Sequence, residues 1–237
     1  MLTIKILKCI ITDKGNNMLY SKINRLYQAA WLFNKDRREF YHVLKLVKFV
    51  FFYEVFSTIK GLETASLDFK IYEQGPVDTR LRGDFEFRSA EFMNKIYEIK
   101  DSITSIDTEI AKKAYWTVNT LNKHEVSDLT HKFDYWKKGV PKNKVWANTN
   151  IDGNPFDLSD SDKELARILF DMADIDVIDN SNVIHFNGKH FVLNNNDFEK
   201  LTEKQQETLE EISELDDDSL QNPIYVSLED DGGIIID

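Results

Sequence analysis

The stretch LKLVKFVFFYEVF, residues 44–56, decides the fold of this 237-residue chain. It lies within a helix that we predict over residues 38–59, and apolar side chains occupy almost every side of that helix. A helix without a polar face must lie at the centre of a bundle or be covered by a partner protein. The aromatic residues on its Lys45 side are therefore both candidate core residues and candidate partner contacts: Phe49, Phe52 and Phe56.

The segments around this helix also have helical periodicity. Apolar residues recur at helical spacing over residues 20–34, 89–100 and 108–122, and a shorter helix is expected over 125–136. Ser21 is the expected N-cap of the first of these helices. The pattern predicts a mainly α protein whose compact helical domain ends near residue 141.

The sequence YEQGPV, residues 72–77, contains the strongest break in this helical region. Glycine tolerates positive φ, and proline fixes φ, lacks an N–H and pushes the residue before it out of the α region. Residues 67–72 alternate apolar and polar side chains, as in a short extended segment. We therefore expect an ordered turn at Gly75-Pro76, with positive φ at Gly75.

A second motif, SDLTHKFDYWKK at residues 127–138, precedes the sequence Gly139-Val140-Pro141. Two lysines followed by a glycine and a proline are typical of the C-terminal end of a helix. Trp136 lies just before this end, so packing is its expected role.

These segments together resemble the Panacea antitoxin domain. That family has a helix rich in lysine and leucine, then a Y-x-x-GPV motif or a close variant, then L-T-H-x-x-x-x-W-K, and the resemblance covers about residues 20–138. We expect the matching residues to be structural rather than contacts to a toxin. They are Tyr72, Gly75, Pro76, Val77, Leu129, Thr130, His131, Trp136 and Lys137.

The resemblance implies a binding protein that neutralises a cognate toxin, with no catalytic residues and no cofactor. The toxin would be encoded beside it, and the family acts against unrelated toxins, including enzymes that inhibit translation; the acidic C-terminus of this chain would suit a toxin with a basic surface. Some members of the family are thought to deliver the toxin to a protease. Direct inhibition and delivery to a protease both remain open from the sequence.

The C-terminal part reads as a small α+β extension made of two segments. Residues 146–199 are expected to hold a helix opened by a capping box at Ser161, followed by a β-hairpin whose two-residue turn is Asn187-Gly188. Residues 200–237 are expected to form an acidic helix, with a capping box at Thr202, and a tail. The tail would end in a terminal hairpin or would add a strand to a partner's sheet. We place the helical domain at residues 1–145.

Charge is concentrated at the C-terminus. The chain has a net charge of −11, and residues 196–237 carry fourteen acidic residues against two lysines, a net charge of −12. A segment of this kind is either solvated or attracts a basic partner. The apolar stripe of the acidic helix and one strand residue are further candidate partner contacts: Leu209, Ile212, Leu215 and Tyr225.

Two other functions compete with the antitoxin interpretation. His124, Asp128 and His131 share one face of a helix and could hold a catalytic metal in a hydrolase, although a structural metal site normally needs four ligands. His131 is better explained as a hydrogen-bonded structural residue, and His185 and His190 as a cross-strand pair. A DNA-binding regulator would need a basic stripe, which the balanced body lacks, so no nucleic-acid partner is expected.

The sequence predicts a cytoplasmic protein without a membrane partner. The single cysteine, Cys9, excludes an internal disulfide and is typical of a reducing compartment. Lys5 and Lys8 interrupt the apolar N-terminus, so a signal peptide is not expected. Residues 40–56 are too short and too charged to cross a bilayer.

Overall fold

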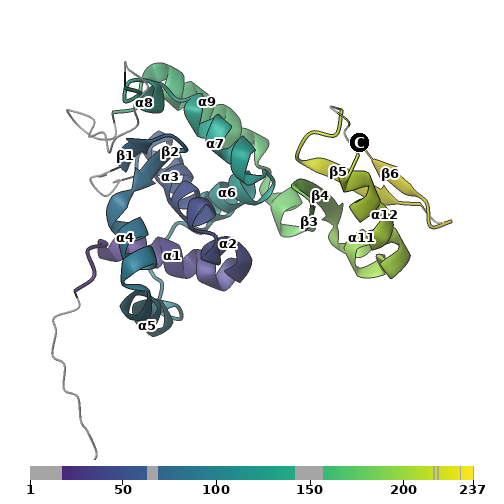
Figure 1. Ribbon diagram of the computed structural model, residues 1–237, viewed down its shortest axis with the longest axis horizontal. Coiled ribbons are helices and arrows are strands. Elements are labelled where there is room, and N and C mark those ends of the chain that lie inside the picture. Colours follow the sequence, from purple (N-terminus) through teal and green to yellow (C-terminus); the bar gives the residue numbers. More distant parts are fainter. Residues whose placement is uncertain are drawn as a thin grey trace, which may run out of the picture.

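The structure is a computed structural model that describes residues 18–62, 69–141, 157–215, 217, 219–229 and 231–236. Its described part is mainly helical, as predicted, with a helical body and a smaller sheet-bearing part beside it (Figure 1). The predictions that concern the N-terminus, from Cys9, Lys5 and Lys8, fall outside the described residues. The helices of the body are α1 (Ile23–Lys35), α2 (Arg37–Tyr41), α3 (Val43–Ile59), α4 (Thr79–Phe87), α5 (Ser89–Ile99), α6 (Thr108–Asn119), α7 (Lys123–His131), α8 (Asp134–Lys137) and α9 (Asp160–Met172).

Helix α3 is the centre of the body, as its sequence predicts. Thirteen of its 17 residues are buried, including two lysines and a glutamate. Phe51 packs edge to face on Phe133, and Phe56 packs in the same way on Phe170 of α9. The interpretation of Phe49, Phe52 and Phe56 as partner contacts is wrong, because all three rings are fully buried within the protein's own core.

The predicted helix over residues 38–59 is in fact two helices. His42 adopts an extended conformation between α2 and α3, and Asp36 caps α2 by accepting hydrogen bonds from the backbone N–H groups of Arg38 and Glu39. Asp36 is thus both the C-cap of α1 and the N-cap of α2. The change of direction brings Arg38 and Glu39 next to the first turn of α3.

The start of α1 also differs from the prediction. Lys22, not Ser21, is the N-cap residue. The hydroxyl of Ser21 instead donates to Asp84 Oδ2 at 2.6 Å. Asp84 belongs to α4, a helix that the sequence pattern did not predict, and it also accepts a hydrogen bond from Arg88 Nε at 2.6 Å. Ser21 thus contacts a buried carboxylate instead of capping α1.

The segment around Gly75 forms a β-hairpin. Strands β1 (Phe69–Tyr72) and β2 (Gly75–Asp78) are antiparallel, and Tyr72 pairs with Gly75 across the turn. Gly75 has φ +98°, the positive value expected from the sequence. The turn itself is made by Glu73 and Gln74, so Gly75-Pro76 begins the second strand rather than forming the turn.

Helix α9 belongs to the helical body and not to the C-terminal extension. Its cap is Ser159, which forms a capping box with Asp162, instead of the predicted Ser161. Ala166 and Phe170 are buried in the main core against α3. The boundary expected at residue 146 therefore moves to the end of α9.

The C-terminal part is built on a four-stranded sheet. Its hairpin of β3 (Ser181–Phe186) and β4 (Lys189–Asn194) turns at Asn187-Gly188, both with positive φ, which confirms the predicted hairpin. The expected terminal hairpin is also confirmed: β5 (Ile224–Leu228) pairs with β6 (Ile234–Ile236). Strand β5 runs parallel to β4, so the hairpin extends the protein's own sheet. Helices α10 (Ile175–Asp179), α11 (Asn195–Lys200) and α12 (Glu203–Ser213) accompany this sheet.

The acidic helix α12 covers the sheet with its apolar stripe. Thr202 and Gln205 form the predicted capping box. Leu209 is fully buried and Ile212 packs beside it in a core shared with Phe191 and Ile224. Leu209 and Ile212 are therefore core residues rather than partner contacts, because the sheet is their apolar neighbour. Leu215 remains exposed.

A third small core joins the body to the sheet. Trp116 of α6 packs with Ala173, Ile178 and Val192. His190 Nδ1 donates to the carbonyl oxygen of Asn119 at 2.6 Å across the same junction. The sheet is thus attached to α6 by both apolar and polar contacts.

Candidate functional site

The three segments of the family-like pattern meet at one buried point. Lys48 of α3 donates from Nζ to Thr130 Oγ1 of α7 at 3.2 Å and lies 3.5 Å from the carbonyl oxygen of Pro76. A Cβ added to Gly75 would overlap both Lys48 Nζ and Thr130 Oγ1. Glycine is therefore required at position 75 for its conformation and for this close approach. We call Lys48, Gly75 and Thr130 the buried lysine node.

The lysine of this node is unusual because it is fully buried without a carboxylate partner among the described residues. Burial lowers the pKa of Lys48 to about 7. Thr130 also donates its hydroxyl to the carbonyl oxygen of Ser127 at 2.7 Å, which leaves its oxygen oriented to accept from Lys48. The node is a polar contact inside an aromatic core.

A second set of contacts attaches β1 to α7 and α8. Trp136 donates from Nε1 to the carbonyl oxygen of Tyr72 at 2.9 Å. Tyr135 donates from its hydroxyl to the carbonyl oxygen of Phe69 at 3.3 Å. His131 stacks on Trp136, with 3.7 Å between ring centroids. These motif residues therefore contact one another and position the hairpin. Val77 is buried and Leu129 partly buried, whereas Lys137 is a surface residue that pairs with Asp134.

Sequence reasoning missed a buried ion pair network on the other side of the hairpin. Arg25 of α1 bonds to Glu54 of α3 and, through Nε at 2.8 Å, to Asp78 Oδ2. Asp78 also caps α4 through the backbone N–H groups of Arg80 and Leu81. The network connects four elements, and only the Asp78 cap has a local sequence signal.

The structure does not assemble the alternative metal site. His124 is exposed, and the imidazole of His131 is stacked on Trp136 with Nδ1 3.8 Å from Asp128. Burial, and then the nearby charge of Lys48, lower the pKa of His131. No group of three or more histidine, cysteine, aspartate or glutamate residues in the described part of the chain could hold a metal ion.

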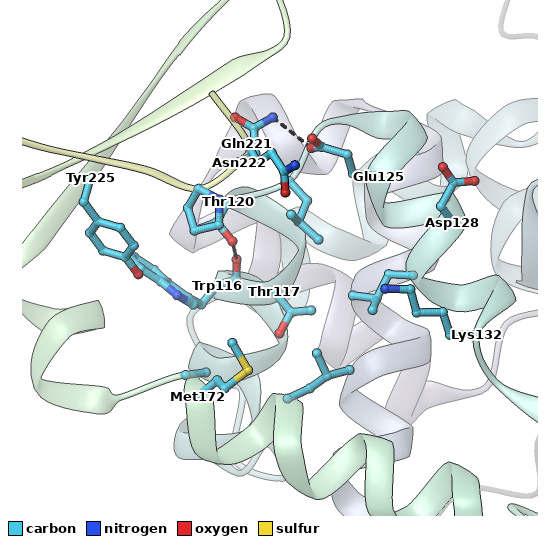
Figure 2. A pocket seen from close by; sticks show the side chains of 15 residues that line it. Trp116, Thr117, Thr120, Glu125, Asp128, Lys132, Met172, Gln221, Asn222 and Tyr225 are labelled. Atoms are coloured by element: carbon cyan, nitrogen blue, oxygen red, sulfur yellow. Dashed lines mark hydrogen bonds between the residues drawn. The ribbon is translucent and has the colours of Figure 1, made fainter. Parts of the chain in front are cut away.

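A groove lies between the helical body and the C-terminal sheet. Its volume is about 440 Å³, and Figure 2 shows Tyr225 and Met172 at one end with Asp128 and Lys132 at the other. Met172 is 75% exposed and Tyr225 is 41% exposed. Of the predicted partner contacts, Tyr225 thus lies on this groove, whereas Leu215 is exposed elsewhere. The larger apolar side chains that line the groove, besides Ala173 and Pro223, are Trp116, Leu121, Leu129, Leu169, Met172 and Tyr225.

The polar side of the groove is tied to the fold by hydrogen bonds. Glu125 accepts from Asn222 Nδ2 at 2.8 Å, as the dashed line in Figure 2 shows, and it also completes the capping box of α7 with Asn122. Asp128, in contrast, has an exposed side chain. Glu125 is therefore structural, and Asp128 is available to a ligand at the rim.

Comparison of the chain with protein-family models, with curated proteins and with solved structures gives no match. Within the described residues, no helix combines the length and the apolar character that a bilayer crossing requires.

Proposed function

We propose that this chain is an antitoxin that neutralises a protein toxin by direct binding, and that it acts in the cytoplasm. The observation that carries the proposal is the contact between the three motif segments at the buried lysine node. Lys48, Gly75 and Thr130 are far apart in the sequence but touch through the motif residues themselves. This contact supports the interpretation of the three segments as parts of one motif.

The groove beside α6 and α9 is the surface that we assign to the toxin. Exposed methionine and tyrosine side chains are frequent anchors of protein interfaces, because they bury large apolar areas. Met172 and Tyr225 both border this groove. We therefore propose that an apolar segment of the toxin packs between them.

Charge supports a basic toxin. Asp128 is exposed at the rim of the groove, and the outward side of α12 carries exposed glutamates. Such a surface speeds association with a basic partner and repels acidic ones. An enzyme that acts on RNA or nucleotides has the basic surface that this arrangement would attract. Direct blocking requires only the complex, and delivery to a protease would use the same contact.

The experiment starts from the reading frames that flank the gene. Each is expressed from an inducible promoter, alone and together with this chain, and growth is measured. We expect one flanking product to stop growth and this chain to restore it, with the two proteins co-purifying. A chain that restores growth without forming a complex contradicts direct binding, and the absence of any toxic neighbour contradicts the antitoxin proposal.

A further inference from the structure

A second cavity also borders the junction between the body and the sheet. Its volume is about 580 Å³, within the range of small-molecule sites. It is lined by the start of α3, the start of α7 and the turn of the β3–β4 hairpin. We call it the histidine cavity, because four of its lining residues are His42, His124, His185 and His190.

Positive charge predominates in this cavity, although the protein as a whole is acidic. Four cationic residues line it against two carboxylates, Glu39 and Glu125. Glu125 is occupied by its hydrogen bonds to Asn222 and to the α7 cap. The cationic residues are Arg38, Lys45, Lys123 and Lys189.

Two of these cations are held by the fold and two face solvent. Lys45 bonds to the carbonyl oxygen of Leu121, and Lys189 donates from Nζ to that of Leu220 at 2.6 Å. Arg38 is more than half exposed and contacts His185 Nε2 through Nη2 at 3.1 Å. Lys123 is exposed in the first turn of α7. Arg38 and Lys123 are therefore the side chains that can reach a bound anion.

The backbone adds to this positive potential. Helix α3, 17 residues long, follows the N-cap residue His42, whose imidazole makes no capping hydrogen bond in the described structure. Helix α7 also begins next to the cavity, but its N-cap Asn122 already accepts from the N–H groups of His124 and Glu125. The N-terminus of a helix carries a partial positive charge, and the uncapped N–H groups of α3 favour a phosphate.

The histidines respond to the same potential. His185 and His190 stack across the hairpin with 3.9 Å between ring centroids. Burial, and then the charges of Lys45 and Arg38, lower the pKa of His190 to about 4, and similar causes lower the pKa of His185. Burial and the charges of Lys45 and Lys123 lower the pKa of His42. These shifts favour the neutral imidazoles, so the positive charge of the cavity comes from its lysine and arginine side chains.

One buried carboxylate in the cavity is only partly satisfied. Glu39 is 4% exposed, and its Oε2 forms an ion pair with Lys45 Nζ at 3.5 Å, without a well-directed hydrogen bond among the described residues. A buried carboxylate oxygen gains from a directed donor, which a hydroxyl or amine of a ligand could supply. An anion alone would not supply it.

We propose that the histidine cavity binds a small phosphate ester that carries hydroxyl groups, namely a sugar phosphate or a mononucleotide. Its phosphate lies at the N-terminus of α3 between Arg38 and Lys123, and a hydroxyl donates to Glu39. The ligand would contact both the body and the sheet. This site adjoins the groove assigned to the toxin, with Glu125 and Asn222 lining both, but the proposal does not depend on the proposed function.

Isothermal titration calorimetry of the full chain tests the proposal with four probes: AMP, ribose 5-phosphate, inorganic phosphate and adenosine. We expect AMP or ribose 5-phosphate to bind more tightly than inorganic phosphate, and adenosine to bind least. Equal affinity for AMP and ribose 5-phosphate indicates a sugar phosphate site, whereas tighter binding of AMP indicates a nucleotide site. Adenosine that binds as tightly as AMP, inorganic phosphate that binds as tightly as either ester, or no binding of any probe overturns the proposal.

Variants locate the site. Lys123→Gln should weaken binding of the preferred ester about tenfold or more, because a charge-assisted hydrogen bond is lost. Lys200→Gln, which changes an exposed lysine of α11 away from the cavity, should leave the affinity unchanged. NMR of the wild-type chain adds a direct measurement: the bound ester should raise the pKa of His42. Equal effects of the two variants, or histidine signals that do not respond, contradict the assignment.

Discussion

Lys48 and Thr130, 82 residues apart in the chain, meet at 3.2 Å inside the aromatic core, with no space for a side chain at Gly75 beside them. A lysine in such a position loses its hydration, so its few polar contacts have a large effect on stability. The packing of the hairpin against α3 and α7 depends on this node.

Thr130→Val should destabilise the protein by about 1–3 kcal/mol, because the buried Lys48 Nζ would lose its hydroxyl acceptor. Urea denaturation followed by circular dichroism measures this change. Thr208→Val is the matched control, since Thr208 also donates to a backbone carbonyl but lies on the surface helix α12. Equal losses in the two variants would show that the Lys48 contact adds nothing.

The stability of the protein should depend on pH through Lys48. The pKa of this lysine is about 7 in the folded protein and 10.5 in the unfolded chain. Between these values the unfolded chain binds more protons, so the free energy of unfolding rises with pH, by up to about 1.4 kcal/mol per pH unit. The penalty for burial is thus complete below about pH 7 and is relieved as pH rises toward 10.5.

Comparison with Lys48→Met isolates this contribution from the other titrating groups. The stability advantage of the variant over the wild type should be greatest near pH 6 and should shrink by about pH 9. Lys200→Met, at an exposed position, should show no such trend. A constant difference between wild type and Lys48→Met would contradict the lowered pKa.

Gly75→Ala should prevent stable folding or cost about 3 kcal/mol or more, because positive φ and overlap with Lys48 and Thr130 add together. Gly61→Ala is the control, since Gly61 also has positive φ, +70°, but has no atom within 4 Å of an added Cβ. Thermal unfolding of both variants separates strain from overlap. If Gly61→Ala is as damaging as Gly75→Ala, the close approach at the node has no energetic weight.

Phe52→Ala should cost about 3–5 kcal/mol, because it removes a fully buried ring from the middle of α3. Phe87→Ala, which truncates a ring that is 80% exposed, should change stability by about 0.5 kcal/mol or less. The midpoint of urea denaturation measures both. A small effect at Phe52 would mean that α3 is not the centre of the core.

Local sequence signals predicted the elements that depend on local physics. The apolar run of α3 and the Asn187-Gly188 turn could each be identified from neighbouring residues alone. Helix α4 was not predicted, because its polar residues give little apolar periodicity, although its N-cap Asp78 is a local signal. The stripe of α12 was visible, but whether it faces a partner or its own sheet is decided by the distant strands β4 and β5.

The candidate sites were less predictable, because they join distant segments. No rule of spacing shows that Lys48 is buried while Lys137, a lysine in another segment of the same pattern, is exposed. The contact of Arg25 with Glu54 and Asp78 has no local signal for the same reason. The motif residues could be recognised in the sequence, but their mutual contacts required the folded structure.

The affinity of the purified chain for the toxin encoded beside it tests the account most directly, with Met172→Glu and Phe87→Glu compared by calorimetry. Both changes place a carboxylate at the last residue of a helix on an exposed position, but only Met172 borders the groove. We predict a stable complex for the wild type, a loss of about thirtyfold or more in Met172→Glu and no change in Phe87→Glu. A wild-type chain that does not bind the toxin would contradict the account.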